Sequence, residues 1–101
     1  MRIEISGRGL EITDAIRSYA DTKCQKLLKF FDGVQEIEVV LDQERRDHHE
    51  EFTAEIIVTV VKHEPFIAKA MGKDVYASID LASDKATRQI TDYKKKLRDH
   101  H

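Results

Sequence analysis

The feature that most constrains the fold is the change of hydrophobic period along the chain. Four segments alternate apolar and polar residues, which predicts strands with one apolar face. They span residues 2–7, 35–42, 52–62 and 66–73. Two longer segments, 13–31 and 75 to about 98, repeat their apolar residues at helical spacing and carry one apolar stripe each. The predicted order of elements is therefore β-α-β-β-β-α.

Only one face of each predicted strand is consistently apolar, so both helices have to cover the same face of one sheet. The first strand–helix–strand unit should form a parallel pair, and the next three strands an antiparallel meander. We expect an α+β fold, a four-stranded mixed sheet with two helices packed on one face. The opposite face would present acidic side chains, at Glu4, Glu36, Glu38, Asp42 and Glu55. An irregular loop is expected over 42–51.

Charge is unevenly distributed although the formal net charge is only −2. Stretch 17–30 carries four basic residues against one acidic residue, and 85–98 carries six against one. Between them, 34–62 has eight acidic residues against three basic ones. Charges more than about 8–10 Å apart are screened at physiological salt, so a polyanion responds to the local field. The helices of a near-neutral chain can therefore bind RNA.

At 100° per residue, the basic residues fall on the flanks and outer surfaces of the two predicted helices. Two such rows lying side by side would make one phosphate-binding surface, since each neutralised phosphate adds counterion release. Each single lysine can also belong to the solvated face of an amphipathic helix, so the pattern alone leaves both interpretations open. The candidate phosphate-binding residues are Lys23, Lys26, Lys29, Lys85, Arg88 and Lys96.

Catalytic and metal-binding motifs are absent from the sequence. It contains no G-x-S-x-G, G-x-G-x-x-G, Walker, C-x-x-C or H-E-x-x-H pattern. The adjacent His48 and His49 would diverge on a strand and share no helix face, which favours a solvated loop over a metal site. Cys24 has no histidine positioned to activate it and is interpreted as a packing residue. We expect neither enzymatic activity nor a cofactor or metal.

Length and composition predict one domain, 1–101. The first residues lack the apolar region of a signal peptide, and no apolar run is long enough to cross a membrane. A single cysteine cannot form an intramolecular disulfide, which is typical of a reducing compartment. We therefore expect a cytoplasmic protein.

Short motifs occur in a distinctive order along nearly the whole chain. They are I-S-G at 5–7, E-I-T at 11–13, A-I-R at 15–17, K-x-x-K-L-x-K-F-F at 23–31, V-V-L at 39–41, V-Y-A-S-I-D at 75–80, D-K-A-T-R-Q-I at 84–90 and Y-K-K-K-L at 93–97. In this order they resemble the short bacterial ribosome hibernation promoting factors, which are similar to the ribosome-associated inhibitor called protein Y. One departure is Asp92, where relatives often carry a basic residue.

The resemblance implies a fold related in its later portion to double-stranded-RNA-binding domains. It implies binding to the small ribosomal subunit and its rRNA between head and body, where the protein would overlap the mRNA channel and tRNA sites. Translation would stop in stationary cells, and a separate small modulation factor would favour paired, idle ribosomes. The six candidate residues occupy positions of the family's basic surface. No dimerisation domain follows Leu97, so the short form is expected, a monomer off the ribosome.

Three alternatives remain open. The protein can be a protein Y-type inhibitor that inactivates single ribosomes without pairing them. It can be a generic double-stranded-RNA-binding module. It can also be an interaction module that binds a basic protein partner through the acidic face of the sheet.

Overall fold

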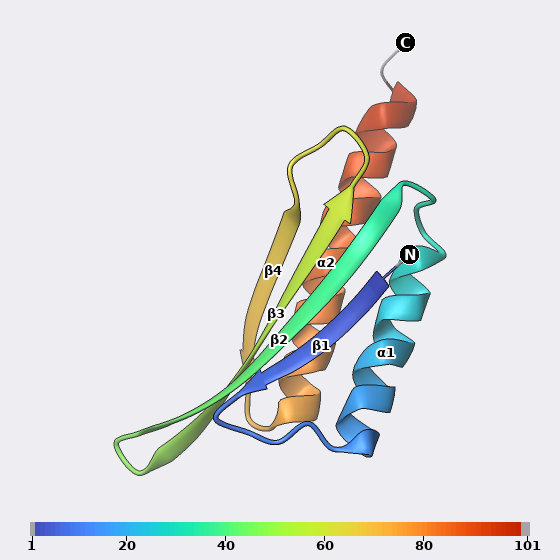
Figure 1. Cartoon of the computed structure of the whole chain (residues 1–101). Coiled ribbons are helices and arrows are strands. Elements are labelled where there is room, and N and C mark those ends of the chain that lie inside the picture. The colour runs from blue at the N-terminus through green and yellow to red at the C-terminus, as the bar shows by residue number, and fades with distance from the viewer. Residues whose placement is uncertain (1, 100–101) are drawn as a thin grey trace.

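The computed structural model describes residues 2–99, and its elements follow the order β-α-β-β-β-α (Figure 1). The elements are β1 (Arg2–Arg8), α1 (Asp14–Leu28), β2 (Val34–Arg46), β3 (His49–Val60), β4 (Phe66–Gly72) and α2 (Val75–Asp99). The sheet order is β1-β2-β3-β4, with β1 parallel to β2 and the other pairs antiparallel. The predicted α+β fold with a four-stranded mixed sheet is confirmed.

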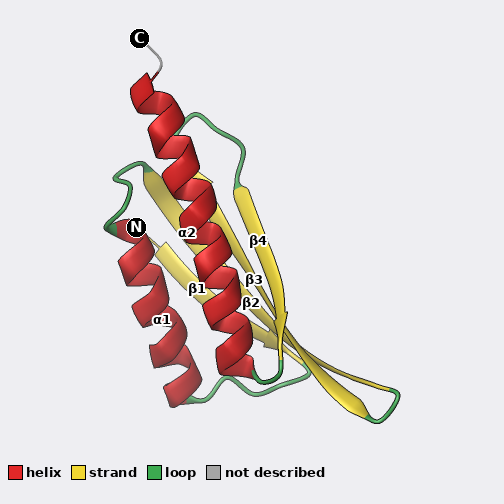
Figure 2. Ribbon diagram, turned by 180° about the vertical axis from the view of Figure 1, so that it is seen from behind, coloured by secondary structure: helices red, strands yellow, loops and turns green. Residues whose placement is uncertain are grey.

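Both helices pack on one face of the sheet (Figure 2). α1 contacts β1 and β2, whereas α2 contacts β3 and β4. Because side chains alternate along each strand, every second one lies between the sheet and the helices, where it is removed from water. Residues exposed by 2% or less include Ala20, Leu27, Ile37, Val39, Leu41, Ala54, Ile56, Val58, Ile79, Ala82, Ala86 and Ile90. Among residues 2–99, neither helix combines the length and apolar character needed to cross a membrane.

The prediction of an irregular loop over 42–51 is wrong. β2 and β3 continue their pairing to Arg46 and His49, and the two strands form a long hairpin that projects beyond the helices (Figure 1). Asp47 and His48 have φ angles of 46° and 69°, as a two-residue hairpin turn of the mirror-image type requires. The extension is exposed at its tip and has no apolar face, so the sequence pattern carried no strand signal there.

Of the predicted helix ends, the C-terminal end of α1 differs from expectation. Thr13 caps α1, because its hydroxyl oxygen accepts a 3.2 Å hydrogen bond from the Ile16 amide. The helix predicted over 13–31 stops at Leu28, which places Phe30 in the following turn and Phe31 in the connection to β2. α2 begins after Asp74, whose carboxylate accepts a 2.7 Å bond from the Ala77 amide, and it continues past the turn between β3 and β4 (Figure 1).

Candidate nucleic-acid interface

The two helices form a layer whose solvent side carries the predicted basic residues. α1 and α2 lie next to each other, with their N-terminal ends at the same end of the molecule (Figure 2). Five of the six candidates are exposed, and Lys23 is half-buried. The candidates in this layer are Lys23 and Lys26 on α1, Lys29 at its C-cap, and Lys85, Arg88 and Lys96 on α2.

Lys23 links the two helices rather than facing solvent freely. Its Nζ atom lies 3.1 Å from Oδ1 of Asp80 and 5.5 Å from the centre of the Tyr19 ring. The Tyr19 hydroxyl donates a 2.6 Å hydrogen bond to the same carboxylate oxygen. These contacts hold the pKa of Asp80 below its ordinary value, the Tyr19 hydrogen bond contributing most, and raise the pKa of Lys23. The Asp80 carboxylate therefore compensates part of the Lys23 charge.

Lys85 lies against the edge of the sheet. Its Nζ atom donates a 2.8 Å hydrogen bond to the carbonyl of Lys69, and Gln89 Nε2 donates a 3.1 Å bond to the carbonyl of Ile67. β4 is an edge strand, so these two side chains cap carbonyl groups that no neighbouring strand pairs. A carbonyl carries no net charge, so this hydrogen bond brings no carboxylate to the Lys85 ammonium.

The candidate residues on α2 face a different direction from those on α1. Asp80 marks the side of α2 that faces α1, and at 100° per residue Lys85 and Lys96 lie about 140–160° around the helix from it. Arg88 lies about 80° from Asp80, and it lines a hollow together with Lys85, Leu81 and Met71. The structure thus brings Lys85 together with Arg88 and turns Lys85 toward β4 instead of toward α1, and Lys96 lies on the same side of α2 as Lys85.

A second basic cluster lies where both helices end, and the sequence prediction did not include most of it. Lys29, Lys94 and Arg98 line a groove of about 560 Å³ that also contains Phe30 and Leu97. Positive charge near a helix C-terminus interacts favourably with the helix dipole. The run of basic residues at 94–98, at the end of the predicted helix, was the sequence feature that could have indicated this cluster. We call this cluster the basic end; it consists of Lys29, Phe30, Lys94, Lys95 and Arg98.

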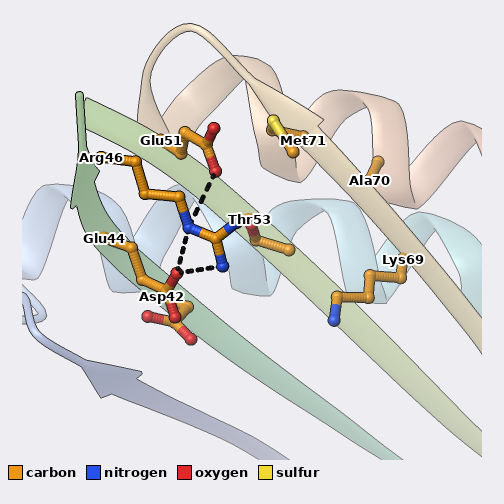
Figure 3. Close-up of a pocket in the computed structure, with 8 residues that line it drawn as sticks. All are labelled: Asp42, Glu44, Arg46, Glu51, Thr53, Lys69, Ala70 and Met71. Atoms are coloured by element: carbon orange, nitrogen blue, oxygen red, sulfur yellow. Dashed lines mark hydrogen bonds and ion pairs between the residues drawn. The ribbon is translucent and has the colours of Figure 1, made fainter. Parts of the chain in front are cut away.

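The outer sheet face, turned away from the helices, presents the expected acidic side chains with basic ones among them. The register places Glu36 beside Arg2, Asp42 beside Arg8, and Glu55 beside Lys69. A hollow near the hairpin contains Arg46, whose guanidinium lies 3.1 Å from Glu44 and 4.0 Å from Glu51 (Figure 3). Arg2 pairs in the same way with Glu4 and with Glu36. The ion pairs therefore compensate part of the negative charge of this face, and among the residues described Glu38, Asp42 and Glu55 belong to none of them.

Cys24 is a free cysteine that lies in the core. The Cys24 side chain is 2% exposed in the core, and burial raises the pKa of its thiol to about 12. The interpretation of Cys24 as a packing residue is confirmed. Within residues 2–99, no three His, Cys, Asp or Glu side chains gather closely enough to hold a metal ion. The helical layer is the surface whose chemistry best suits a polyanion.

Comparison with known proteins identifies relatives of this chain over almost its whole length. The family described as Sigma 54 modulation protein / S30EA ribosomal protein matches residues 3–98. The ribosome hibernation promoting factor of Escherichia coli K12 is 37% identical over 100 residues, covering 99% of this chain and 100% of the relative. The ribosome hibernation promotion factor of Lactococcus lactis is 33% identical over 98 residues, which are 96% of this chain and 51% of that protein.

Two solved structures share the fold. The crystal structure of the Thermus thermophilus Protein Y N-terminal domain has a TM-score of 0.78 at 34% identity, covering 92% of this chain and 99% of that chain. A ribosomal subunit interface protein from Coxiella burnetii has a TM-score of 0.79 at 22% identity, covering 94% of this chain and 99% of that chain. Because its sequence identity is only 22%, the similarity to the Coxiella burnetii protein supports the fold alone.

Proposed function

This chain belongs to the Sigma 54 modulation protein / S30EA ribosomal protein family, and on that premise we propose that it is a ribosome hibernation factor that binds the small ribosomal subunit through its helical layer. Bound there, it would overlap the mRNA and tRNA sites, inhibit translation in the cytoplasm of stationary cells, and favour inactive, paired ribosomes. The proposal involves no catalytic step. The rRNA contacts would come from Lys23, Lys26, Lys29, Lys85, Arg88 and Lys96.

The observation that carries the proposal is the number of basic side chains in the helical layer that have no carboxylate partner. Among residues 2–99, the only ion pair formed by a basic residue of α1 or α2 is the one between Lys23 and Asp80. Lysine and arginine groups that are exposed and unpaired can neutralise phosphates and release their counterions, which supplies a large share of the affinity for a nucleic acid. On the outer sheet face, by contrast, Arg2 and Arg46 are engaged by glutamates.

The orientation of the α2 residues suits a surface that meets two separate stretches of RNA backbone. Lys26 and Lys29 would contact one stretch over α1, and Lys85 with Arg88 would contact another over the flank of α2. A phosphate approaching Lys85 can share its ammonium with the Lys69 carbonyl, since an ammonium carries three N–H donors. Lys23 would contribute less than Lys26, because Asp80 compensates its charge.

Gradient sedimentation with purified ribosomes tests the proposal. The protein should migrate with small subunits and with single ribosomes, should inhibit translation in a purified system, and should allow paired ribosomes when a modulation factor is added. Absence of the protein from every ribosomal fraction would contradict the proposal. Equal affinity for small subunits and for a plain RNA duplex would instead indicate a generic double-stranded-RNA-binding module.

A protein Y-type activity, inhibition of single ribosomes without pairing, is the second candidate. It is favoured by the close structural likeness to the Thermus thermophilus Protein Y N-terminal domain. The same gradients distinguish the two activities. Inhibition of translation with no paired ribosomes, even when the modulation factor is present, would favour the protein Y-type activity.

A further inference from the structure

Two adjacent phenylalanines after α1 have different surroundings. Phe31 is half-buried and packs against the core, with its ring centre 5.6 Å from that of Tyr93 in an edge-to-face arrangement. Phe30 is 46% exposed and is not one of the residues that pack against the core. A large aromatic side chain left in water contributes little to folding stability, because the hydrophobic gain comes only from area removed from water.

Phe30 stands between two hollows lined by basic residues. One is the groove of about 560 Å³ shared with Lys29, Lys94 and Arg98, and the other is a smaller hollow of about 250 Å³ shared with Lys94, Lys95 and Arg98. The acidic residue in these linings is Asp32, so the basic residues outnumber it four to one. Leu97, 47% exposed, adds a second apolar side chain to the larger groove.

An exposed aromatic ring surrounded by cationic side chains has the chemistry of a binding site for an unpaired nucleotide. The ring offers a flat surface on which a base stacks, and the cations contact the phosphates on either side of that base. From this arrangement we infer that the basic end is a nucleotide-binding subsite, in which Phe30 stacks on an unpaired base of single-stranded RNA. The inference rests on the proposed function for the identity of the RNA as ribosomal.

Base stacking distinguishes this subsite from the rest of the helical layer. A base inside a duplex is covered on both faces by its neighbours, so Phe30 can reach only a base in a loop, bulge or single strand. An acidic peptide would satisfy the cations as well, but it would leave the exposed Phe30 ring without a matching planar partner. The basic end therefore favours single-stranded RNA over both a duplex and an acidic protein segment.

Fluorescence provides a direct test, because the chain contains no tryptophan. Phe30→Trp introduces a single reporter at the proposed stacking position, and Ile67→Trp introduces one on the outer sheet face, at a side chain that is 55% exposed. Addition of a ten-nucleotide oligouridylate should quench the fluorescence of Phe30→Trp and leave that of Ile67→Trp unchanged. An abasic oligonucleotide of the same length and charge, and polyglutamate, should quench far less. Equal quenching by either of these two probes, or no quenching by oligouridylate, would overturn the inference.

Affinity gives an independent readout. Phe30→Leu should bind oligouridylate about tenfold more weakly than the unmodified protein, whereas Phe30→Tyr should stay within about twofold, because tyrosine keeps the stacking ring. Both variants should unfold at nearly the same temperature as the unmodified protein, since the side chain lies outside the core. Unchanged affinity of Phe30→Leu would contradict the stacking role.

Cosedimentation with small subunits separates this inference from the proposed function. If the unmodified protein binds subunits but Phe30→Trp in the bound complex is not quenched, the stacking subsite is wrong and the proposed function stands. If the protein does not bind subunits but oligouridylate still quenches Phe30→Trp, the ribosomal function is wrong and the stacking subsite stands.

Discussion

The Tyr19 hydroxyl on α1 donates a 2.6 Å hydrogen bond to Oδ1 of Asp80 on α2, across a sequence separation of 61 residues. Lys23 places its ammonium 3.1 Å from the same oxygen. The Tyr19 ring also meets Tyr76 edge to face, with ring centres 5.0 Å apart. This network joins the two helices on the solvent side of the layer, so it affects both the stability of the layer and the charge that the layer offers to RNA.

The first prediction concerns stability and pH in Asp80→Asn. The pKa of Asp80 is held below its unfolded value by the Tyr19 hydrogen bond and the Lys23 ammonium, so the carboxylate stabilises the fold above that unfolded value. Its contribution disappears as the pH falls through the folded pKa. The free energy of unfolding of both proteins is measured in urea from pH 7 to pH 3. At pH 7 the unmodified protein should be more stable than Asp80→Asn by less than about 1 kcal/mol, because the site is partly exposed and screened.

The difference between the two proteins should begin to shrink below about pH 4, near the ordinary aspartate pKa, and should shrink further as the pH falls through the lower pKa of the folded state. Asp92→Asn is the matched control on α2, since Asp92 is exposed and belongs to none of the ion pairs found within residues 2–99. A stability difference for Asp80→Asn that stays constant between pH 7 and pH 3 would contradict the assigned role of the carboxylate.

The second prediction is that Asp80→Asn binds small subunits more tightly than the unmodified protein does. The substitution releases Lys23 from its carboxylate partner and makes its charge available to a phosphate. The slope of log affinity against log salt concentration should steepen by up to about one. Asp92→Asn removes the same formal charge without freeing a lysine. A larger gain in affinity for Asp92→Asn than for Asp80→Asn would show that Lys23 lies outside the interface.

The third prediction concerns the thiol of Cys24, which is buried and has a pKa raised to about 12. Iodoacetamide reacts with the thiolate, so alkylation of the folded protein at pH 8 should be on the order of a thousandfold slower than alkylation in denaturing urea. The reaction is followed by mass spectrometry. Comparable rates in the two conditions would mean that the core around Cys24 opens readily.

The fourth prediction is that Gly9→Ala is strongly destabilising. Gly9 has a φ of 73°, and a Cβ atom placed there would lie 2.6 Å from the carbonyl oxygen of Gln43 in β2. The strain and the clash together should lower the free energy of unfolding by more than about 1 kcal/mol. Ser18→Ala, at an exposed position of α1, should change it by less than about 0.5 kcal/mol. Equal stability of the two variants would show that the turn after β1 can shift.

The sequence predicted the fold because each strand has one apolar face and each helix one apolar stripe, which leaves few ways to bury them together. It did not predict the hairpin extension to Arg46 and His49, because that part of the ribbon lies in water and shows no hydrophobic alternation. Periodicity cannot detect a strand that buries nothing.

The candidate site was predictable only to the level of the helix surface. Helical angles placed the basic residues outside the core, but they carried no information about partners on other elements. The pairing of Lys23 with Asp80 and the bond from Lys85 to the Lys69 carbonyl both depend on the tertiary packing. The helical pattern predicted α2 to about residue 98, but it did not show that the end of this helix meets the residues that follow α1, which forms the basic end.

The central claim, that the helical layer rather than the outer sheet face binds the ribosome, is tested most directly by matched charge reversals. Lys26→Glu with Arg88→Glu reverses two exposed residues of the helical layer, and Arg8→Glu with Lys69→Glu reverses two exposed residues of the outer sheet face. Both double variants change the net charge equally, and circular dichroism verifies that each is folded. In cosedimentation with small subunits, the helical-layer variant should lose binding and the sheet-face variant should retain it. Retained binding by the helical-layer variant, or loss of binding only in the sheet-face variant, would contradict the account.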